Sequence, residues 1–114
     1  MPLFWFFVLR LHYSLRQFSA MGIAFLVLVS LNINSEEERK RIMMEHVAYW
    51  TVQTQRGIAV LFGPVLEPPT PWGLAVIEVE GEDDIRPLQD NDPAVQAGIL
   101  KYEVYPMKIG MIRK

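Results

Sequence analysis

The segment that most constrains the fold is a single long helix predicted between Ser35 and Gly57. Ser35 is a good N-cap, and Glu38 three residues later completes a capping box for the free amides of the first turn. Gly57 is a natural stop, because glycine readily adopts the left-handed backbone that ends helices. About five turns are expected, and their apolar stripe runs through Ile42, Met43, His46, Val47, Tyr49 and Trp50. Such a stripe needs a sheet or another helix to cover it.

Short segments after this helix have the composition of strands. Segments 58–62 and 74–80 are rich in β-branched and apolar residues, and the loop between them holds four prolines. We therefore expect two strands joined by a rigid loop rather than by a tight hairpin turn. Segment 84–91 is predicted to be a short second helix, because its proline falls in the first turn, where the missing amide has no intrahelical partner anyway. Segment 99–112 is predicted to be a last strand, at a sheet edge because it contains Pro106.

A buried first strand at 24–31 would complete the order β-α-β-β-α-β. The predicted fold class is α+β, a ferredoxin-like βαββαβ unit whose four-stranded antiparallel sheet carries both helices on one face. The second face of that sheet would be uncovered, although segment 74–80 has apolar side chains on both sides. We therefore expect two sheets to pack face to face in a homodimer.

The N-terminal region allows three interpretations. A transmembrane helix needs about 20 mostly apolar residues, and the dense apolar run 23–31 is much shorter. A signal peptide needs a small-x-small cleavage site after the run, and none is evident. We favour the third interpretation, in which 24–31 is the first strand. Residues 1–20 are then an N-terminal extension outside the fold, residues 21–114 are the domain, and Met21 is the natural start.

Composition excludes several classes of function. Hydrophobic residues make up 51% of the chain and charged residues 21%, which is typical of a globular protein. With a net charge of −2 and no basic face, nucleic-acid binding is not expected. The chain has no cysteine, which excludes disulfides, thiolate metal sites and a cysteine nucleophile, and which fits a reducing cytoplasm. No metal-ligand spacing and no cofactor motif is recognisable, so we expect neither a metal nor a cofactor.

His46 is the main candidate for chemistry. The only other histidine, His12, lies in the predicted extension. A histidine on an apolar stripe is often a core residue with one hydrogen bond, but Asp92 at the end of the second helix offers it a partner. That carboxylate would accept from one ring nitrogen and leave the other as a general base. The alternative role of Asp92 is local, because Asp-Pro is a common turn signal.

Five motifs occur in order along the chain: EHVAYW, GIAVLFGP, GLAVIEVE, DPAVQAG and YEVYPM. Together, at these spacings, they resemble the YCII-related family, over roughly Phe25 to Met107. The resemblance implies the ferredoxin-like fold of the dimeric α+β barrel superfamily. It also implies a site built on His46 and Asp92, with Gly63 and Pro64 after the second strand. The segment taken as the first strand lacks the basic residue often found at its end in this family, which leaves no obvious anchor for an anionic substrate.

Two functions remain open at this point. The first is a small acid–base enzyme of the lyase or isomerase type, in which His46 and Asp92 act on a small carbonyl or lactone compound. Gly63, Pro64, Tyr49 and Trp50 are then the candidate substrate contacts. The second is a non-catalytic module that binds a small ligand or a protein, in which His46 and Asp92 are a structural pair. A cavity open to the second nitrogen of His46 would favour the enzyme.

Overall fold

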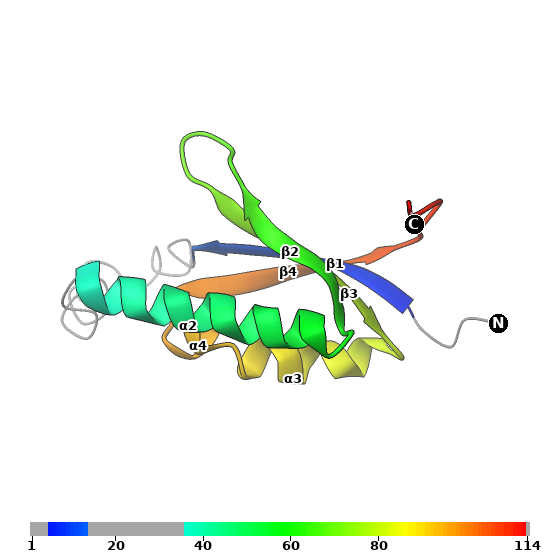
Figure 1. The fold of residues 1–114 in the computed structure, drawn as a ribbon, viewed down its shortest axis with the longest axis horizontal. Coiled ribbons are helices and arrows are strands. Elements are labelled where there is room, and N and C mark those ends of the chain that lie inside the picture. Colours follow the sequence, from blue (N-terminus) through cyan, green and yellow to red (C-terminus); the bar gives the residue numbers. More distant parts are fainter. Residues whose placement is uncertain (1–4, 14–35, 114) are drawn as a thin grey trace, which may run out of the picture.

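The computed structural model describes residues 5–13 and 36–113. Within them the order of elements is β1 (Trp5–Tyr13), α2 (Glu36–Gln55), β2 (Ala59–Val65), β3 (Trp72–Val79), the 3-10 turn η2 (Glu82–Asp84), α3 (Ile85–Asp90), α4 (Pro93–Gln96) and β4 (Leu100–Met107). The strands form one sheet, and the helices lie together on one side of it (Figure 1).

The sheet has the order β2-β3-β1-β4, and each neighbouring pair of strands is antiparallel. This is the topology of the split βαβ unit, so the predicted ferredoxin-like α+β fold is confirmed. β4 is an edge strand, as Pro106 indicated. Pro64 lies in β2, on the opposite edge, where a missing amide does not interrupt the ladder.

The first strand differs from the sequence-based expectation. β1 is formed by Trp5–Tyr13, within the segment expected to lie outside the fold, and it is a central strand paired with both β3 and β4. Its side chains alternate: Phe7, Leu9 and Leu11 are buried, whereas Arg10 is exposed. This period of two is the mark of a strand with one face on a core. The strand expected at 24–31 lies outside the described residues.

Helix α2 begins and ends close to the predicted positions. Gly57 has a φ of +82°, which is the left-handed conformation expected of a helix stop. The buried residues are Ile42, His46, Trp50 and Gln53, and they repeat every three or four positions. Val47 was placed on the buried stripe by sequence, but it is 50% exposed and lies at the margin of that stripe.

The second helical region is split into short pieces. The predicted helix 84–91 corresponds to η2 followed by α3, which ends at Asp90. A further single turn, α4, was not predicted. Pro93 opens α4 because proline suits the first helical position, and Asp92 is the N-cap.

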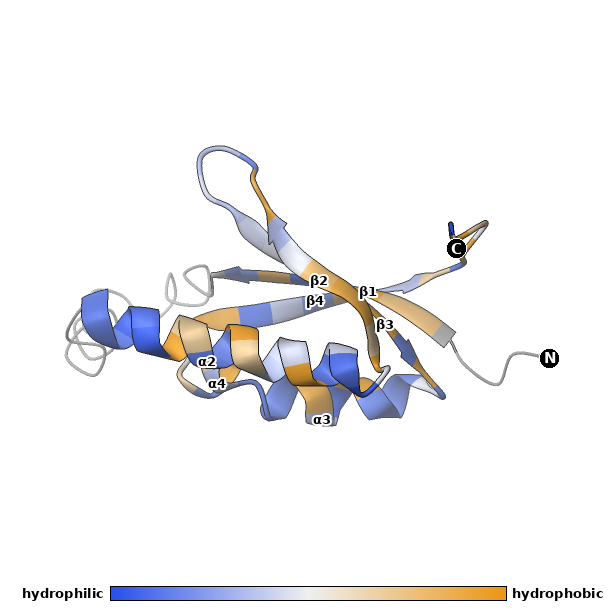
Figure 2. Cartoon of the chain, in the orientation of Figure 1, coloured by the Kyte–Doolittle hydropathy of each residue, from blue (hydrophilic) through white to orange (hydrophobic). Residues whose placement is uncertain are grey.

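The core lies between the sheet and the helices. Leu9, Ala75 and Ile77 from the two central strands are almost fully buried there, together with Trp50 from α2. The first turns of α2 are hydrophilic, whereas the sheet is mainly hydrophobic (Figure 2). The opposite face of the sheet is not covered by any described helix and carries exposed apolar side chains, among them Leu61 and Met107.

Candidate functional site

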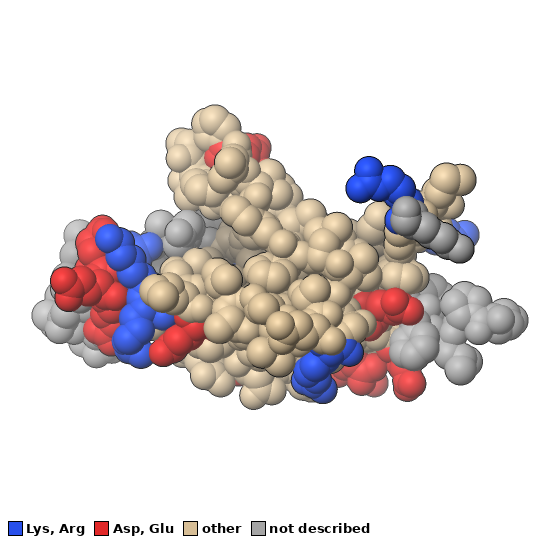
Figure 3. Space-filling model, in the orientation of Figure 1, with Lys and Arg blue, Asp and Glu red and all other residues tan. Residues whose placement is uncertain are grey.

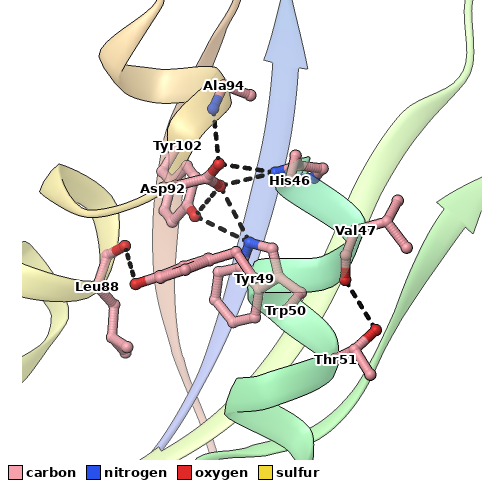
Figure 4. A network of polar contacts seen from close by, with 9 residues as sticks. All are labelled: His46, Val47, Tyr49, Trp50, Thr51, Leu88, Asp92, Ala94 and Tyr102. Carbon is pink, nitrogen blue, oxygen red and sulfur yellow. Dashed lines mark hydrogen bonds and ion pairs between the residues drawn. The ribbon is translucent and has the colours of Figure 1, made fainter. Parts of the chain in front are cut away.

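The carboxylate of Asp92 is the centre of a polar network between α2, α4 and β4. Asp92 caps α4, because its Oδ1 accepts a hydrogen bond from the amide of Ala94 at 2.9 Å. Its Oδ2 accepts from the Tyr102 hydroxyl at 2.6 Å and from Trp50 Nε1 at 3.0 Å (Figure 4). The side chain is 0% exposed, so only protein donors can compensate its lost hydration.

His46 is the remaining partner of this carboxylate. Its Nδ1 lies 2.9 Å from Oδ1 and 2.8 Å from Oδ2 of Asp92. His46 and Trp50 reach the same carboxylate because side chains four residues apart share a helical face. An ionised carboxylate only accepts hydrogen bonds, so Nδ1 carries a hydrogen, and the lone pair of the neutral ring is on Nε2. Among the described residues Nε2 has no hydrogen-bond partner, and His46 borders a cavity.

The network keeps Asp92 ionised. Burial alone raises the pKa of Asp92, but the hydrogen bonds from His46 and Tyr102, the positive charge that His46 can carry and the Ala94 amide together lower that pKa below its ordinary value. The pKa of Tyr102 is strongly raised, first by burial and then by the adjacent carboxylate. Tyr102 therefore stays a neutral donor, and Asp92 stays the acceptor.

A cavity of about 260 Å³ lies beside His46, between α2 and the sheet. Its lining is mainly apolar and comprises Leu11, His12, Met43, His46, Val47, Trp50, Phe62, Gly63, Pro64, Pro71, Trp72, Gly73, Leu74, Ala75 and Leu100. Gly73 helps to keep this space open, since a Cβ there would lie 3.3 Å from the Cβ of Leu11 on the neighbouring strand. An imidazole that borders a mostly apolar cavity of this kind is a common arrangement in ligand sites.

The structure brings together most of the residues that the sequence indicated. His46, Trp50, Gly63 and Pro64 border the cavity, and Asp92 lies directly behind His46. Tyr49 does not border it. Its hydroxyl donates to the carbonyl of Leu88 on α3 at 2.7 Å, on the other flank of α2.

Tyr102 is the member of the network that sequence reasoning missed. It lies in YEVYPM, one of the quoted motifs, and it faces the helices because it alternates with Lys101 and Glu103 along β4. Strand alternation by itself places Tyr102 on the same face as Leu100 and Val104. That placement carried no information on its hydroxyl partner, which is ten residues earlier in the chain and comes close only through the turn at α4.

His12 and Arg10 lie on β1, in the segment expected to be an extension. His12 also borders the cavity, but strand alternation directs its side chain to the opposite face of the sheet, where Nε2 lies 3.1 Å from Glu103 Oε1. Arg10 lies on that face too, 4.7 Å from the centre of the Trp72 ring. The basic residues that the sequence had not assigned to the first strand are thus present on β1, but they face away from His46.

Two other properties concern the described residues as a group. No cluster of three or more histidine or carboxylate side chains within them has the arrangement of a metal site. None of the helices in the described ranges has the length and hydropathy needed to cross a membrane.

The fold and the sheet topology are those of a ferredoxin-like α+β domain. The chain belongs to the YCII-related family, because the YCII-related domain model matches residues 23–108. The match starts after β1. A search of curated proteins gave no match.

Among solved structures, the chain resembles 5-chloro-2-hydroxyhydroquinone dehydrochlorinase (TftG) from Burkholderia phenoliruptrix AC1100, in complex with 2,5-dihydroxybenzoquinone. The TM-score is 0.61 at 20% sequence identity, and the alignment covers 92% of this chain and 95% of that one. At this identity the similarity establishes the fold.

Proposed function

We propose that this protein is a small acid–base enzyme of the lyase or isomerase type. His46 Nε2 is its proton-transfer atom, and its substrate is a small carbonyl or lactone compound held in the cavity beside α2. The observation that carries this proposal is the pairing of His46 Nδ1 with a fully buried carboxylate, while the ring borders a mainly apolar cavity.

The chemistry follows from which nitrogen is engaged. Nε2 removes a proton from a carbon next to the substrate carbonyl, which gives an enolate and an imidazolium. Asp92 stabilises the imidazolium through the Nδ1 hydrogen bond without itself taking a proton. Return of the proton to another carbon completes an isomerisation, whereas expulsion of a leaving group from the enolate completes an elimination. Gly63, Pro64 and Trp50 form part of the wall that positions the substrate.

The similar solved structure supports the choice of substrate size. That protein is named a dehydrochlorinase, and its structure contains a small quinone. A cavity of about 260 Å³ is below the usual 300 Å³ lower bound for ligand sites, so a single-ring compound suits it better than a larger one.

Hydrogen–deuterium exchange isolates the proton-transfer step, whatever bond change follows it in the full reaction. A panel of enolisable ketones and lactones, phenylacetone among them, is incubated with the protein in D2O, and loss of the α-proton signal is followed by NMR. The wild type accelerates exchange, and His46→Ala and His46→Gln remove the acceleration. Val52→Ala is the matched control, because Val52 is exposed on the same helix and lies outside the cavity lining, and the variant keeps the activity.

Two results would contradict the proposal that the protein is an enzyme. One is an accelerated rate of α-proton exchange that His46→Ala leaves unchanged. The other is a wild type that binds panel compounds but exchanges none of their protons, combined with a large loss of thermal stability in His46→Gln.

A non-catalytic binding module is the second candidate function. It is favoured by the number of structural tasks that Asp92 performs, since its carboxylate caps α4 and ties that turn to α2 and β4. In this case His46 is a structural donor, and its replacement lowers stability without changing any reaction. The exchange assay and the unfolding measurement on His46→Gln separate the two candidates.

We also propose that the protein works as a homodimer in the cytoplasm. Val8, Val76 and Tyr105 are aligned across β3, β1 and β4 on the sheet face that no described helix covers, and a second sheet would bury them. Light scattering should give twice the chain mass for the wild type and a monomer for Val76→Lys. Val52→Lys, at an exposed position on α2, should stay dimeric, and a monomeric wild type would contradict the proposal.

A further inference from the structure

We infer that the cavity selects uncharged single-ring ligands and discriminates against carboxylates of the same size, with Val47 at the position that sets this preference. The inference rests on the proposed function in one respect only, the use of the same cavity. It is a statement about binding and stands or falls separately from any proton transfer.

The first support is the chemistry of the wall. Met43, Val47 and Trp50 come from α2, while Phe62 and Pro64 come from β2. Side chains of this kind replace the water around an apolar ring at little cost. They offer no hydrogen bonds to replace those that a carboxylate loses when it leaves water. Uncharged flat compounds are therefore favoured, and the aromatic side chains can pack against their faces or edges.

The second support is the charge beside the cavity. The buried carboxylate of Asp92 is 2.8 Å from the His46 ring, which itself borders the cavity. The low pKa of Asp92 keeps this negative charge in place at neutral pH. An anionic ligand would thus enter an apolar space next to a fixed negative charge, and both its lost hydration and the repulsion oppose binding.

The third support is the distribution of charge on the surface. In Figure 3 most charged side chains lie toward the left and right ends of the molecule, with an acidic group on the upper lobe and a basic group at the lower edge, whereas the middle of the visible face is formed by other residues. The long pairing side chains of α2, such as Arg41 with Glu38 and Glu45, lie in its first half and are bonded to one another. Glu38 and Arg41 precede Met43, the first residue of α2 that borders the cavity, and Glu45 is bonded to Arg41.

The size of the cavity limits the ligand to one ring. A cavity of about 150 Å³ lined by aliphatic and aromatic side chains holds benzene, and this one measures about 260 Å³. The difference accommodates a few substituents, such as an ester, a ketone or hydroxyl groups, but not a second fused ring system with its own substituents.

Methyl phenylacetate and phenylacetate form a suitable pair of probes, since they share a ring and a carbonyl and differ mainly in charge. Binding of each to the full chain is measured by calorimetry at neutral pH. The wild type should bind the ester and should bind the acid on the order of 100-fold more weakly, the effect of burying an ion without a partner. Equal or tighter binding of the acid overturns the inference, and so does a wild type that binds neither probe at millimolar concentration.

A charge placed at the cavity margin should narrow the preference for the ester. Val47 borders the cavity and is 50% exposed, so a lysine there keeps its stem on the wall and brings its ammonium to the entrance. Val47→Lys should strengthen phenylacetate binding by at least about tenfold, since charge-assisted hydrogen bonds are among the stronger contacts, and should leave ester binding little changed.

Val52→Lys is the matched control. It adds the same charge to the same helix at a position that is 46% exposed and outside the cavity lining, and it should not change the ratio of the two affinities. A similar gain in both lysine variants would mean general electrostatic attraction and would overturn the role given to Val47. If the affinities behave as expected but His46-dependent exchange is absent, the enzyme proposal fails and this inference stands.

Discussion

Removal of the Tyr102 hydroxyl tests its hydrogen bond to the buried carboxylate, and it also removes the acceptor of a 3.1 Å contact from Trp50 Nε1. In Tyr102→Phe the ring keeps its place on β4, while Asp92 Oδ2 loses its 2.6 Å donor. Asp92 retains His46, Trp50 and Ala94 as donors, so its charge remains partly compensated. A hydrogen bond to a charged group contributes about 1.5–3 kcal/mol, and with the other donors in place we expect a loss of about 2 kcal/mol. For a domain of this size, each kcal/mol of lost stability lowers Tm by roughly 4 °C.

Tyr49→Phe is the control for this measurement. The Tyr49 hydroxyl also donates a single hydrogen bond, at 2.7 Å, but to the neutral carbonyl of Leu88. Its removal should cost about 1 kcal/mol, the usual contribution of a neutral hydrogen bond, and this loss should not depend on pH between the acid range and neutrality.

The pH dependence distinguishes the two variants. Tyr102 helps to lower the pKa of Asp92 in the folded protein. The resulting stability is therefore fully present above the ordinary carboxyl pKa of about 4 and is lost as pH falls through the folded-state value. The loss caused by Tyr102→Phe should thus be largest at neutral pH and should shrink in acid. Urea unfolding of both variants across this range, with unchanged m-values, is the assay. Equal losses in both variants, with no trend with pH, would refute the view that Tyr102 acts on an ionised Asp92.

Three further predictions follow from the same contacts. Asp92→Ala should lower the free energy of unfolding by about 3–5 kcal/mol, because it leaves several buried donors without an acceptor, and denaturant titration measures it. The wild type should lose stability as pH falls below about 4, because the unfolded chain then binds a proton at Asp92 that the folded protein, with its lowered pKa, binds only at lower pH. Asp92→Asn should flatten this part of the profile; an unchanged slope would contradict the assignment. Gly73→Ala puts a Cβ 3.3 Å from the Cβ of Leu11, so it should cost about 1–3 kcal/mol through overpacking and weaken ester binding in calorimetry. Gly81→Ala, where a Cβ meets nothing within 4 Å, should do neither.

Local signals in the sequence were sufficient for most of the fold. The capping residues and apolar period of α2 and the glycine after it are readable without tertiary contacts. Pro106 indicated an edge strand, because a residue without an amide hydrogen cannot sit in the middle of a sheet. These features depend on neighbours a few residues away. The structure reproduces the extent of α2, its apolar period, the Gly57 stop and the edge position of β4, whereas the predicted cap Ser35 lies outside the described residues.

The first strand was harder to identify because two segments compete for the same position. Segment 24–31 is a continuous apolar run, which suggests a strand buried on both sides. Trp5–Tyr13 instead alternates, with Phe7, Leu9 and Leu11 on the core side and Arg10 opposite. The choice of 24–31 as the first strand left residues 1–20 as an extension. The polar residues between the apolar ones of Trp5–Tyr13 are nevertheless the pattern expected of a strand in a sheet that helices cover on one face only. The antiparallel pairing with β3, in which Leu9 meets Ala75, cannot be read from either segment alone.

The two roles that the sequence offered for Asp92 turn out to be compatible. An aspartate before a proline is expected to cap a turn, and Oδ1 does accept the amide of Ala94. The same side chain also contacts His46, which was the alternative. Both are possible because a carboxylate has two oxygens and about four acceptor sites. The cap fixes the position of the carboxylate without exhausting its acceptors, and the remaining ones meet His46, Trp50 and Tyr102. The turn therefore does more than end a helical region, since it holds a buried negative charge at a set distance from α2. If His46 works as proposed, a weakened cap should also impair proton transfer, because the carboxylate that orients the imidazole would no longer be held in place.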